Sequence, residues 1–317
     1  MNWVLPYIDQ PVEFWDTVRS VLRGEPFKVY FPMPDSPIGT GRPKQPAARM
    51  SDFLRETGLQ KSVLLNPVVH ARPVAEMAKG LIERLRVLHG EFNVGEAVVT
   101  DPLLAFRIRE ALPAMQLAAS TLMEIASPRQ LAMLGGVFDA ITPSGRIMRD
   151  IRALQRLRKA FPGRLRLMVN EGCLPGCPFR IQHFYEMNSG ASRPGSLCVE
   201  ALRAAPWLGL TGAWILPQHL HLFEGLFDEI KLAGRVTLQD PVKYRRVLAA
   251  YNNRSFLLPR DIGGGPATDF DVAKVTEVFY VRTLRCEGRC TSCAVCAEYY
   301  ARTKRAPKKD VTNEQGS

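Results

Sequence analysis

The sequence predicts an α/β fold in which parallel strands alternate with helices. Short apolar runs alternate with helical patterns as far as Tyr251, and this alternation is typical of parallel α/β proteins. Seven or eight strand-like runs are present, and no GxGxxG motif follows the first of them. A strand count near eight without a dinucleotide-binding fingerprint favours a TIM-like (β/α) barrel over a doubly wound sheet.

The expected strands lie at residues 27–33, 62–69, 96–100, 115–120, 139–142, 164–170, 208–216 and 228–232. The helices expected between them cover residues 48–57, 73–88, 102–111, 128–134, 146–161, 219–226 and 241–251. The helix at 73–88 is the clearest, because Val74, Leu81 and Leu85 recur at the spacing of an amphipathic helix. The segment between Asn170 and about Ser196 is expected to be irregular.

The end of the chain departs from this rhythm. After about Tyr280 come four cysteines and a basic tail at 302–309, without apolar periodicity. We therefore expect a TIM-like barrel over residues 1–275 and a short cysteine-rich C-terminal extension over residues 276–317.

Composition limits the class of protein. The 317 residues are 46% hydrophobic and 23% charged, which excludes global disorder. The net charge of +11 favours anionic partners, either a small molecule or RNA. We expect a cytoplasmic protein, because the N-terminus lacks a secretory pattern and no run is long and apolar enough for a membrane span.

Polar side chains follow several expected strands. Asn66, Ser120, Thr142 and Asn170 each stand at a strand end, which in a barrel is the face that carries active sites. Helix capping is the competing explanation for each of them. We take these four as candidate substrate-binding residues.

The seven cysteines fall into two groups and predict metal binding. The first group is Cys173, Cys177 and Cys198, and the second is Cys286, Cys290, Cys293 and Cys296. Closely spaced thiolates select zinc or iron–sulfur clusters. Four cysteines within one short loop are too compact for the two opposed knuckles of a structural zinc site, so an iron–sulfur cluster, of the [4Fe–4S] type, is favoured.

Two other readings of the cysteines stay open. Cys286 to Cys293 has the C-x3-C-x2-C spacing of radical S-adenosylmethionine enzymes, but it lies near the C-terminus, and a fourth cysteine would close the open iron site. Some thiols, Cys198 above all, could be small buried hydrophobes. Two residues beside the first group, Glu171 and His183, are candidates for acid–base catalysis.

Three stretches together resemble a known family. They are the strand 164–170 leading into Cys173, the Cys177-Pro-Phe-Arg sequence, and the segment 230–235 that reads IKLAGR. Their order is similar to that of the collagenase-like peptidase family number thirty-two among those of unknown type. The resemblance implies a TIM-like iron–sulfur barrel, with relatives that act as oxygen-independent hydroxylation factors for ubiquinone precursors or for RNA bases, some of them paired with a second family member.

Carried over by position, the resemblance makes Cys173, Cys177 and Cys198 cluster ligands. It also implies that Lys231 and Arg235 bind an anionic co-substrate such as prephenate. The sequence departs from the family in having Ala233 where Glu is usual, and in lacking a cysteine shortly after Arg235. The first group is therefore one thiolate short, and the chain could hold one cluster or two.

Three functions follow from these observations. The first is an iron–sulfur enzyme, or an enzyme subunit, that hydroxylates or otherwise oxidises a small molecule without oxygen. The second is an RNA-hydroxylating enzyme that uses the basic surface. The third and weakest is a peptidase, because no GxSxG or HExxH motif is present.

Overall fold

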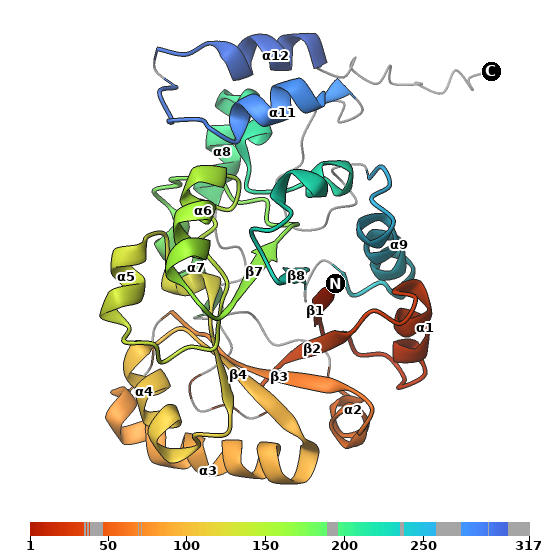
Figure 1. Cartoon of the computed structure of the whole chain (residues 1–317), viewed down its shortest axis with the longest axis vertical. Coiled ribbons are helices and arrows are strands. Elements are labelled where there is room, and N and C mark those ends of the chain that lie inside the picture. Colours follow the sequence, from red (N-terminus) through yellow and green to blue (C-terminus); the bar gives the residue numbers. More distant parts are fainter. Residues whose placement is uncertain are drawn as a thin grey trace, which may run out of the picture.

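The computed structural model describes residues 1–34, 36, 38, 47–68, 70, 72–188, 196–234, 238–257, 274–290 and 292–303. Its centre is a closed barrel of parallel strands in sequence order, which confirms the predicted TIM-like fold (Figure 1). The strands are β1 (Asn2–Pro6), β2 (Phe27–Pro32), β3 (Gln60–Leu65), β4 (Val94–Val99), β5 (Gln116–Ala119), β6 (Ala140–Ile141), β7 (Arg164–Met168) and β8 (Glu229–Lys231). Closure is made by β8 pairing with both β7 and β1.

Helices surround the barrel and follow most strands. They are α1 (Phe14–Val21), α2 (Met50–Arg55), α3 (Val74–Phe92), α4 (Pro102–Ala111), α5 (Pro128–Met133), α6 (Ile151–Ala160), α7 (Arg180–Asn188), α8 (Ser196–Ala204) and α9 (Pro241–Asn252). Two further helices, α11 (Glu277–Thr283) and α12 (Val295–Thr303), form the C-terminal extension beyond α8 at one end of the molecule (Figure 1). None of the described helices is long and apolar enough to cross a membrane.

Four parts of the sequence-based prediction were wrong in detail. The segment 208–216 is not a strand; it contains most of the 3₁₀ helix η2 (Pro206–Thr211), and the eighth strand is instead β1 at the N-terminus. The segment expected to be irregular contains α7. The extension, expected to lack periodicity, forms α11 and α12, and the helix expected at 219–226 is the 3₁₀ helix η3 (Pro217–Phe223).

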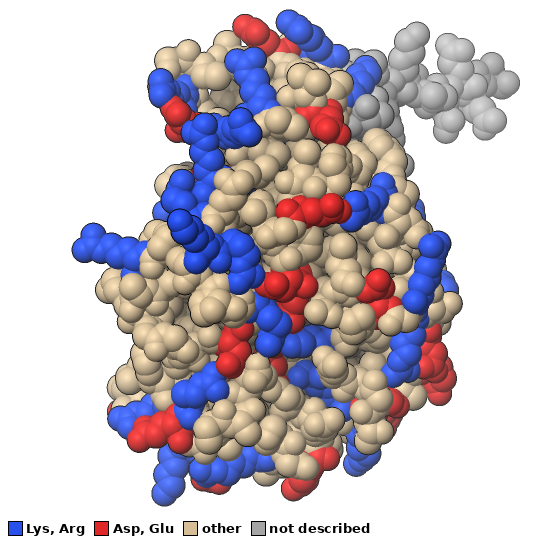
Figure 2. Space-filling view, viewed as in Figure 1, with Lys and Arg blue, Asp and Glu red and all other residues tan. Residues whose placement is uncertain are grey.

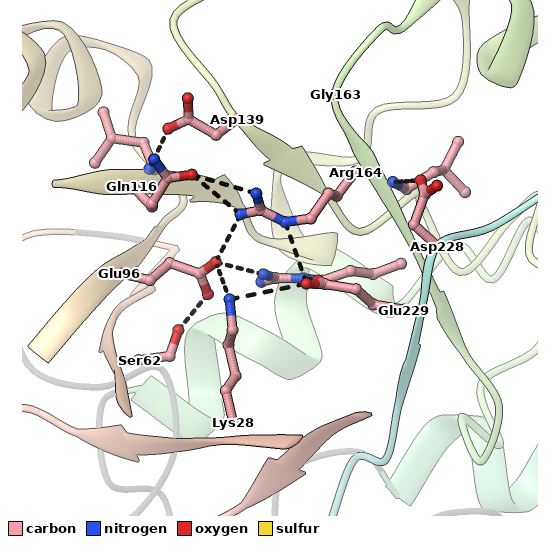
Figure 3. Close-up of polar contacts among 12 residues, drawn as sticks. Lys28, Ser62, Glu96, Gln116, Asp139, Gly163, Arg164, Asp228 and Glu229 are labelled. Atoms are coloured by element: carbon pink, nitrogen blue, oxygen red, sulfur yellow. Dashed lines mark hydrogen bonds and ion pairs between the residues drawn. The ribbon is translucent and has the colours of Figure 1, made fainter. Parts of the chain in front are cut away.

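The bottom of the barrel interior is filled by charged side chains. Glu96 binds Ser62, Lys28 and Arg166, and Glu229 binds Arg166 from the opposite side (Figure 3). Arg166 and Glu96 are buried. Burial alone would raise the pKa of Glu96, but the charges of Arg166 and Lys28 outweigh it and hold that pKa well below its usual range. This layer ties five strands, β2, β3, β4, β7 and β8, together where they begin.

An apolar layer lies directly above the charged one. It consists of Val4, Tyr30, Leu64, Val98, Ala118 and Ala140. Tyr30, Leu64 and Val98 each stand two residues after a member of the charged layer, and alternate residues of a strand point to the same face. The barrel is therefore a packed core at this level, and a ligand can reach only the level above it.

Candidate active site at the C-terminal mouth of the barrel

The residues of the next level are polar and form the floor of the mouth. Two positions beyond the apolar layer stand Asn66, Thr100, Ser120, Thr142 and Asn170. Because strand alternation has a period of two, all five follow inward-pointing positions and meet at the C-terminal ends of β3 to β7. The four substrate-binding candidates named from the sequence thus share one level of the barrel, with Thr100 as a fifth member.

Two of the five side chains form hydrogen bonds that stabilise the structure of the mouth. The Ser120 hydroxyl accepts a hydrogen bond from the Leu122 amide at 3.2 Å, which caps a short 3₁₀ turn. The Asn170 side chain donates to the Ala233 carbonyl at 2.7 Å and accepts from the Ala233 amide at 2.6 Å. Asn170 therefore joins the ends of β7 and β8, and its first role is to hold the mouth in shape.

The other three side chains have buried oxygen atoms that find no hydrogen-bond partner among the residues the structure describes. These are Oδ1 of Asn66, Oγ1 of Thr100 and Oγ1 of Thr142. A buried polar atom without a partner costs about 1–3 kcal/mol. Next to them, His70 Nε2 lies 3.2 Å from Asp101 Oδ2, while His70 Nδ1 is buried and unpartnered in the described structure. The mouth therefore offers both donors and acceptors to a ligand.

Arg180 is the functional residue that the sequence analysis missed. It begins α7, is only 3% exposed, and donates from Nε to Glu124 Oε1 at 2.6 Å. Its two terminal nitrogens are buried and have no hydrogen-bond partner in the described part of the chain. Gly145 makes room for it, since a Cβ at Gly145 would lie 3.1–3.3 Å from the guanidinium.

The charges around Arg180 link it to the first cysteine group. Burial would lower the pKa of Arg180, but Glu171, Cys173 and Glu124 together raise it above its ordinary value. Glu171 is buried and Cys173 is half-buried. Glu171 thus lies beside the mouth, as predicted from its position after β7.

The remaining members of the first cysteine group flank α7 in the sequence: Cys177 precedes α7, and Cys198 lies in α8. Burial and the nearby charge of Cys177 raise the pKa of the Cys198 thiol, so these two cysteines are within electrostatic range of each other. His183, the second acid–base candidate, packs edge-on against Phe184 with ring centroids 5.5 Å apart. Its catalytic role stays a prediction.

The predicted anion-binding pair is only partly described. Lys231 lies in the barrel interior, 6% exposed, with Nζ 4.9 Å from the centre of the Tyr30 ring. It therefore belongs to the apolar level below the mouth and reaches the mouth only from beneath. Arg235 lies outside the described residues.

The second cysteine group lies where α11 and α12 are joined: Cys286, Cys290 and Cys293 are on the connecting loop, and Cys296 is in the first turn of α12. Burial and the charges of Cys286, Cys290 and Cys293 raise the pKa of Cys296 to about 11, so all four thiols are within electrostatic range. The Gly288 amide donates to Cys286 Sγ at 3.4 Å, and Gly288 adopts a φ of +73° that favours glycine. Amide hydrogen bonds to sulfur are typical of cluster-binding loops.

Arg149 clamps this extension to the barrel. Its guanidinium donates to the carbonyls of Leu210 and Gly212 at 2.9 and 2.8 Å and to the Thr283 hydroxyl of α11. It also lies between the rings of Trp214 and Tyr280, 4.7 and 4.4 Å from their centres. Its sequence position, before α6, gave no sign of this role.

The contacts of Arg149 also connect the two cysteine groups. The Ala213 amide donates to the Cys173 carbonyl at 2.9 Å, next to the Gly212 carbonyl that accepts from Arg149. Arg149 in turn is within electrostatic range of Cys296 and Cys286. The extension is therefore attached beside the loop that carries the first group.

Among the described residues, no three His, Cys, Asp or Glu side chains converge closely enough to hold a single metal ion. A lone zinc ion requires such convergence, because its ligands all lie about 2.0–2.3 Å from one centre. An iron–sulfur cluster presents irons at separate corners, so its thiolates stand farther apart.

The fold and the mouth define a TIM-like barrel with a polar C-terminal site and an attached cysteine loop. No family model matches the chain. A protein of Methanocaldococcus jannaschii named as an uncharacterized protease is 24% identical over 308 residues, covering 89% of this chain and 90% of that protein. The solved structure of the U32 peptidase Mk0906 matches with a TM-score of 0.53 and 17% identity, over 73% of this chain and 91% of that one.

These two matches support the family that the sequence resembles. The structural match shows the shared barrel, and the sequence match spans nearly the whole of both chains. The protein matched in sequence is named as a protease, and the protein that shares the barrel fold is named as a U32 peptidase.

Proposed function

We propose that this protein is an iron–sulfur enzyme, or the subunit of one, that oxidises or hydroxylates a small carboxylic acid without oxygen. The observation that carries the proposal is the gathering of Cys286, Cys290 and Cys293 on one loop with Cys296 in the first turn of α12, attached beside the mouth of the barrel by Arg149. A cluster bound there would supply one-electron transfer, and the barrel would supply orientation and charge.

The chain's own residues determine which ligand the mouth accepts. Arg180 presents two unpartnered nitrogens in a fixed fork, which suits a carboxylate. Thr100 and Thr142 offer hydroxyls, and Asn66 offers a carbonyl oxygen that requires a donor. A ligand with both a carboxylate and a hydroxyl group would satisfy these atoms together, as prephenate would.

Glu171 is the acid–base candidate of this mouth. It is 8% exposed and lies within electrostatic range of Arg180. A carboxylate next to the guanidinium is placed to accept a proton from a ligand held by Arg180. The competing role, neutralising Arg180 as a structural ion pair, would leave ligand turnover unchanged in Glu171→Gln.

The first cysteine group supports a second cluster less strongly. Cys173, Cys177 and Cys198 supply three thiols, and the described residues near them provide no fourth cysteine. Three thiolates leave one corner of a [4Fe–4S] cluster open to a substrate or another ligand. Such an open corner beside Glu171 and Arg180 would be the reacting centre of the enzyme.

Iron and sulfide content tests the proposal. Protein purified without oxygen should contain about four irons per chain for one [4Fe–4S] cluster or about eight for two, with equal sulfide. A Cys286→Ser, Cys290→Ser, Cys293→Ser variant should lose about four irons, and a Cys173→Ser, Cys177→Ser variant serves as its counterpart. Little iron with one zinc per chain would contradict the proposal.

Peptide hydrolysis is a second candidate, because the relatives are named as a protease and a peptidase. In that reading Cys173 is the nucleophile and Arg180 stabilises the oxyanion, since the two are within electrostatic range. Chelator-treated, iron-free protein should then cleave fluorogenic peptides, and Cys173→Ser should abolish cleavage while Cys286→Ser leaves it intact. Cleavage absent from the wild type would eliminate this candidate.

A further inference from the structure

We infer that the C-terminal extension is a docking surface for an acidic one-electron carrier protein, and this inference rests on the proposed cluster at Cys286, Cys290, Cys293 and Cys296. The first observation is the exposure of the site. Cys286, Cys290 and Cys293 are all exposed, and only Cys296 is half-buried. An exposed cluster exchanges electrons with an outside partner, because a short distance between the two centres requires the partner to approach the loop directly.

The second observation is an open apolar groove beside the cysteine loop. Val278, Phe279, Val295 and Tyr299 line it between α11 and α12, and it encloses about 210 Å³. Val278 is 83% exposed, although it is an aliphatic residue. Phe279 and Tyr299 stack with ring centroids 3.7 Å apart, so the floor of the groove is rigid. Exposed apolar surface with a polar rim is typical of protein interaction sites.

The third observation is the charge of the rim. Arg282, Arg302 and Glu298 line the groove, so its lining carries two positive charges and one negative charge, and Arg285 lies exposed next to the cysteine loop. None of these three arginines forms an ion pair within the described part of the chain. Figure 2 shows Lys and Arg side chains over this end of the molecule and down the flank beside it.

These three observations select the partner. Unpaired arginines around an apolar groove complement an acidic surface, and such complementarity speeds association of proteins. An acidic carrier with its own redox centre would bring that centre to the exposed thiolates. RNA would be attracted by the same arginines, but it would make no use of the exposed cysteine loop.

The electron transfer balances without any atom moving. The reduced cluster of this protein loses one electron and is oxidised by one unit. The oxidised carrier gains that electron and is reduced by one unit. Oxidation of one substrate molecule in the barrel, by loss of two hydrogens or by addition of an oxygen atom from water, releases two electrons and two protons. The protons pass to solvent, and the two electrons reduce two carrier molecules one after the other.

The test uses the full-length, iron-loaded protein and an acidic plant-type [2Fe–2S] ferredoxin as the probe. Binding is measured by calorimetry at low and high salt, and electron transfer by stopped-flow absorbance without oxygen. We expect binding that weakens at least tenfold as salt rises. An Arg282→Glu, Arg285→Glu variant should bind at least tenfold more weakly, whereas Arg129→Glu on α5, an exposed arginine away from the groove, should bind like the wild type.

Other outcomes separate this inference from the proposed function. Val278→Asp should also weaken ferredoxin binding, and all variants should keep the iron content of the wild type. If iron is present but the wild type does not bind ferredoxin, or binds it independently of Arg282 and Arg285, the docking surface is wrong and the cluster stands. Tighter binding of single-stranded RNA to the same arginines would also overturn it. Absence of iron would instead remove the proposed function itself.

Discussion

At the scale of single residues, the polar level of the mouth was predictable and its arginine was not. Asn66, Ser120, Thr142 and Asn170 follow apolar runs, and strand periodicity is visible in one sequence. Arg180 owes its role to Glu124 and Gly145, which are distant along the chain. Contacts of that kind follow from how loops fold over the barrel, and no local pattern encodes them.

The first prediction concerns Arg180 as a carboxylate-binding residue. Arg180→Gln should weaken binding of prephenate, or of a related hydroxylated carboxylic acid, by about tenfold or more, because a hydrogen bond to a charged group contributes about 1.5–3 kcal/mol. Calorimetric titration of the iron-loaded protein measures this.

The matched control for that experiment is Arg146→Gln. Arg146 Nε also pairs with Glu124, at 3.4 Å, but its side chain is 49% exposed. Its loss should leave ligand affinity within about twofold of the wild type, since exposed ion pairs contribute about 0–1 kcal/mol. Equal affinity of the wild type and Arg180→Gln would contradict the assignment.

At the scale of elements, the sequence correctly predicted the strands that are clearly bounded by turn residues. It did not distinguish strands from other buried segments where an apolar run was ambiguous. The segment 208–216 is apolar and largely buried, yet Pro206, Gly209, Gly212 and Pro217 turn it into 3₁₀ helices and loops. β1 is a run of only five residues at the N-terminus. Periodicity alone does not separate a short buried strand from another buried segment.

The second prediction concerns the attachment of α11 and α12. Arg149→Met removes the hydrogen bonds to Leu210, Gly212 and Thr283 and should loosen the extension, while the barrel stays folded. Amide hydrogen exchange should rise by at least tenfold in α11 and remain unchanged in β1 to β4. Unchanged exchange in α11 would show that the other contacts, such as the packing of α12 on η2 and the stacking of Tyr280 on His219, hold the extension without Arg149.

At the scale of the whole molecule, the two ends of the barrel interior differ in function: the bottom supports the fold, and the mouth is the candidate ligand site. The bottom is closed by a network of buried ion pairs, in which Arg166 Nη1 alone of the Arg166 nitrogens has no hydrogen-bond partner among the described residues, and the mouth carries several unpartnered polar atoms from different strands. Unsatisfied polar groups lower stability and are retained where a ligand completes them. The eight-stranded barrel class could be predicted from the alternation of strands and helices. The difference between the two ends of the barrel interior could be seen only in the closed barrel.

The third prediction concerns the stability supplied by the charge network. Glu96→Gln leaves Arg166 and Lys28 buried with less negative charge, so the free energy of unfolding should fall by about 3–5 kcal/mol. Urea denaturation measures the change. Glu83→Gln, which breaks the exposed pair with Arg86, should cost about 0.5 kcal/mol or less. A similar small loss for Glu96→Gln would contradict the proposed role of the network.

The fourth prediction concerns pH. The folded-state pKa of Glu96 lies below its ordinary value of 4.5, so Glu96 stabilises the fold fully above about pH 4.5. That contribution declines as pH falls below the ordinary value toward the folded-state pKa. Acid titration of the unfolding free energy should therefore show a shallower decline in Glu96→Gln than in the wild type. Parallel curves would mean that Glu96 does not carry this pH dependence.

The central claim is that the cysteine loop between α11 and α12 binds an iron–sulfur cluster. The most direct measurement is the low-temperature EPR spectrum of protein purified without oxygen and reduced with dithionite. We expect an iron–sulfur EPR signal in the wild type. In the Cys286→Ser, Cys290→Ser, Cys293→Ser variant the signal should disappear, or should lose the component that comes from the cluster on this loop. A silent wild-type spectrum together with stoichiometric zinc, or a signal unchanged in that variant, would contradict it.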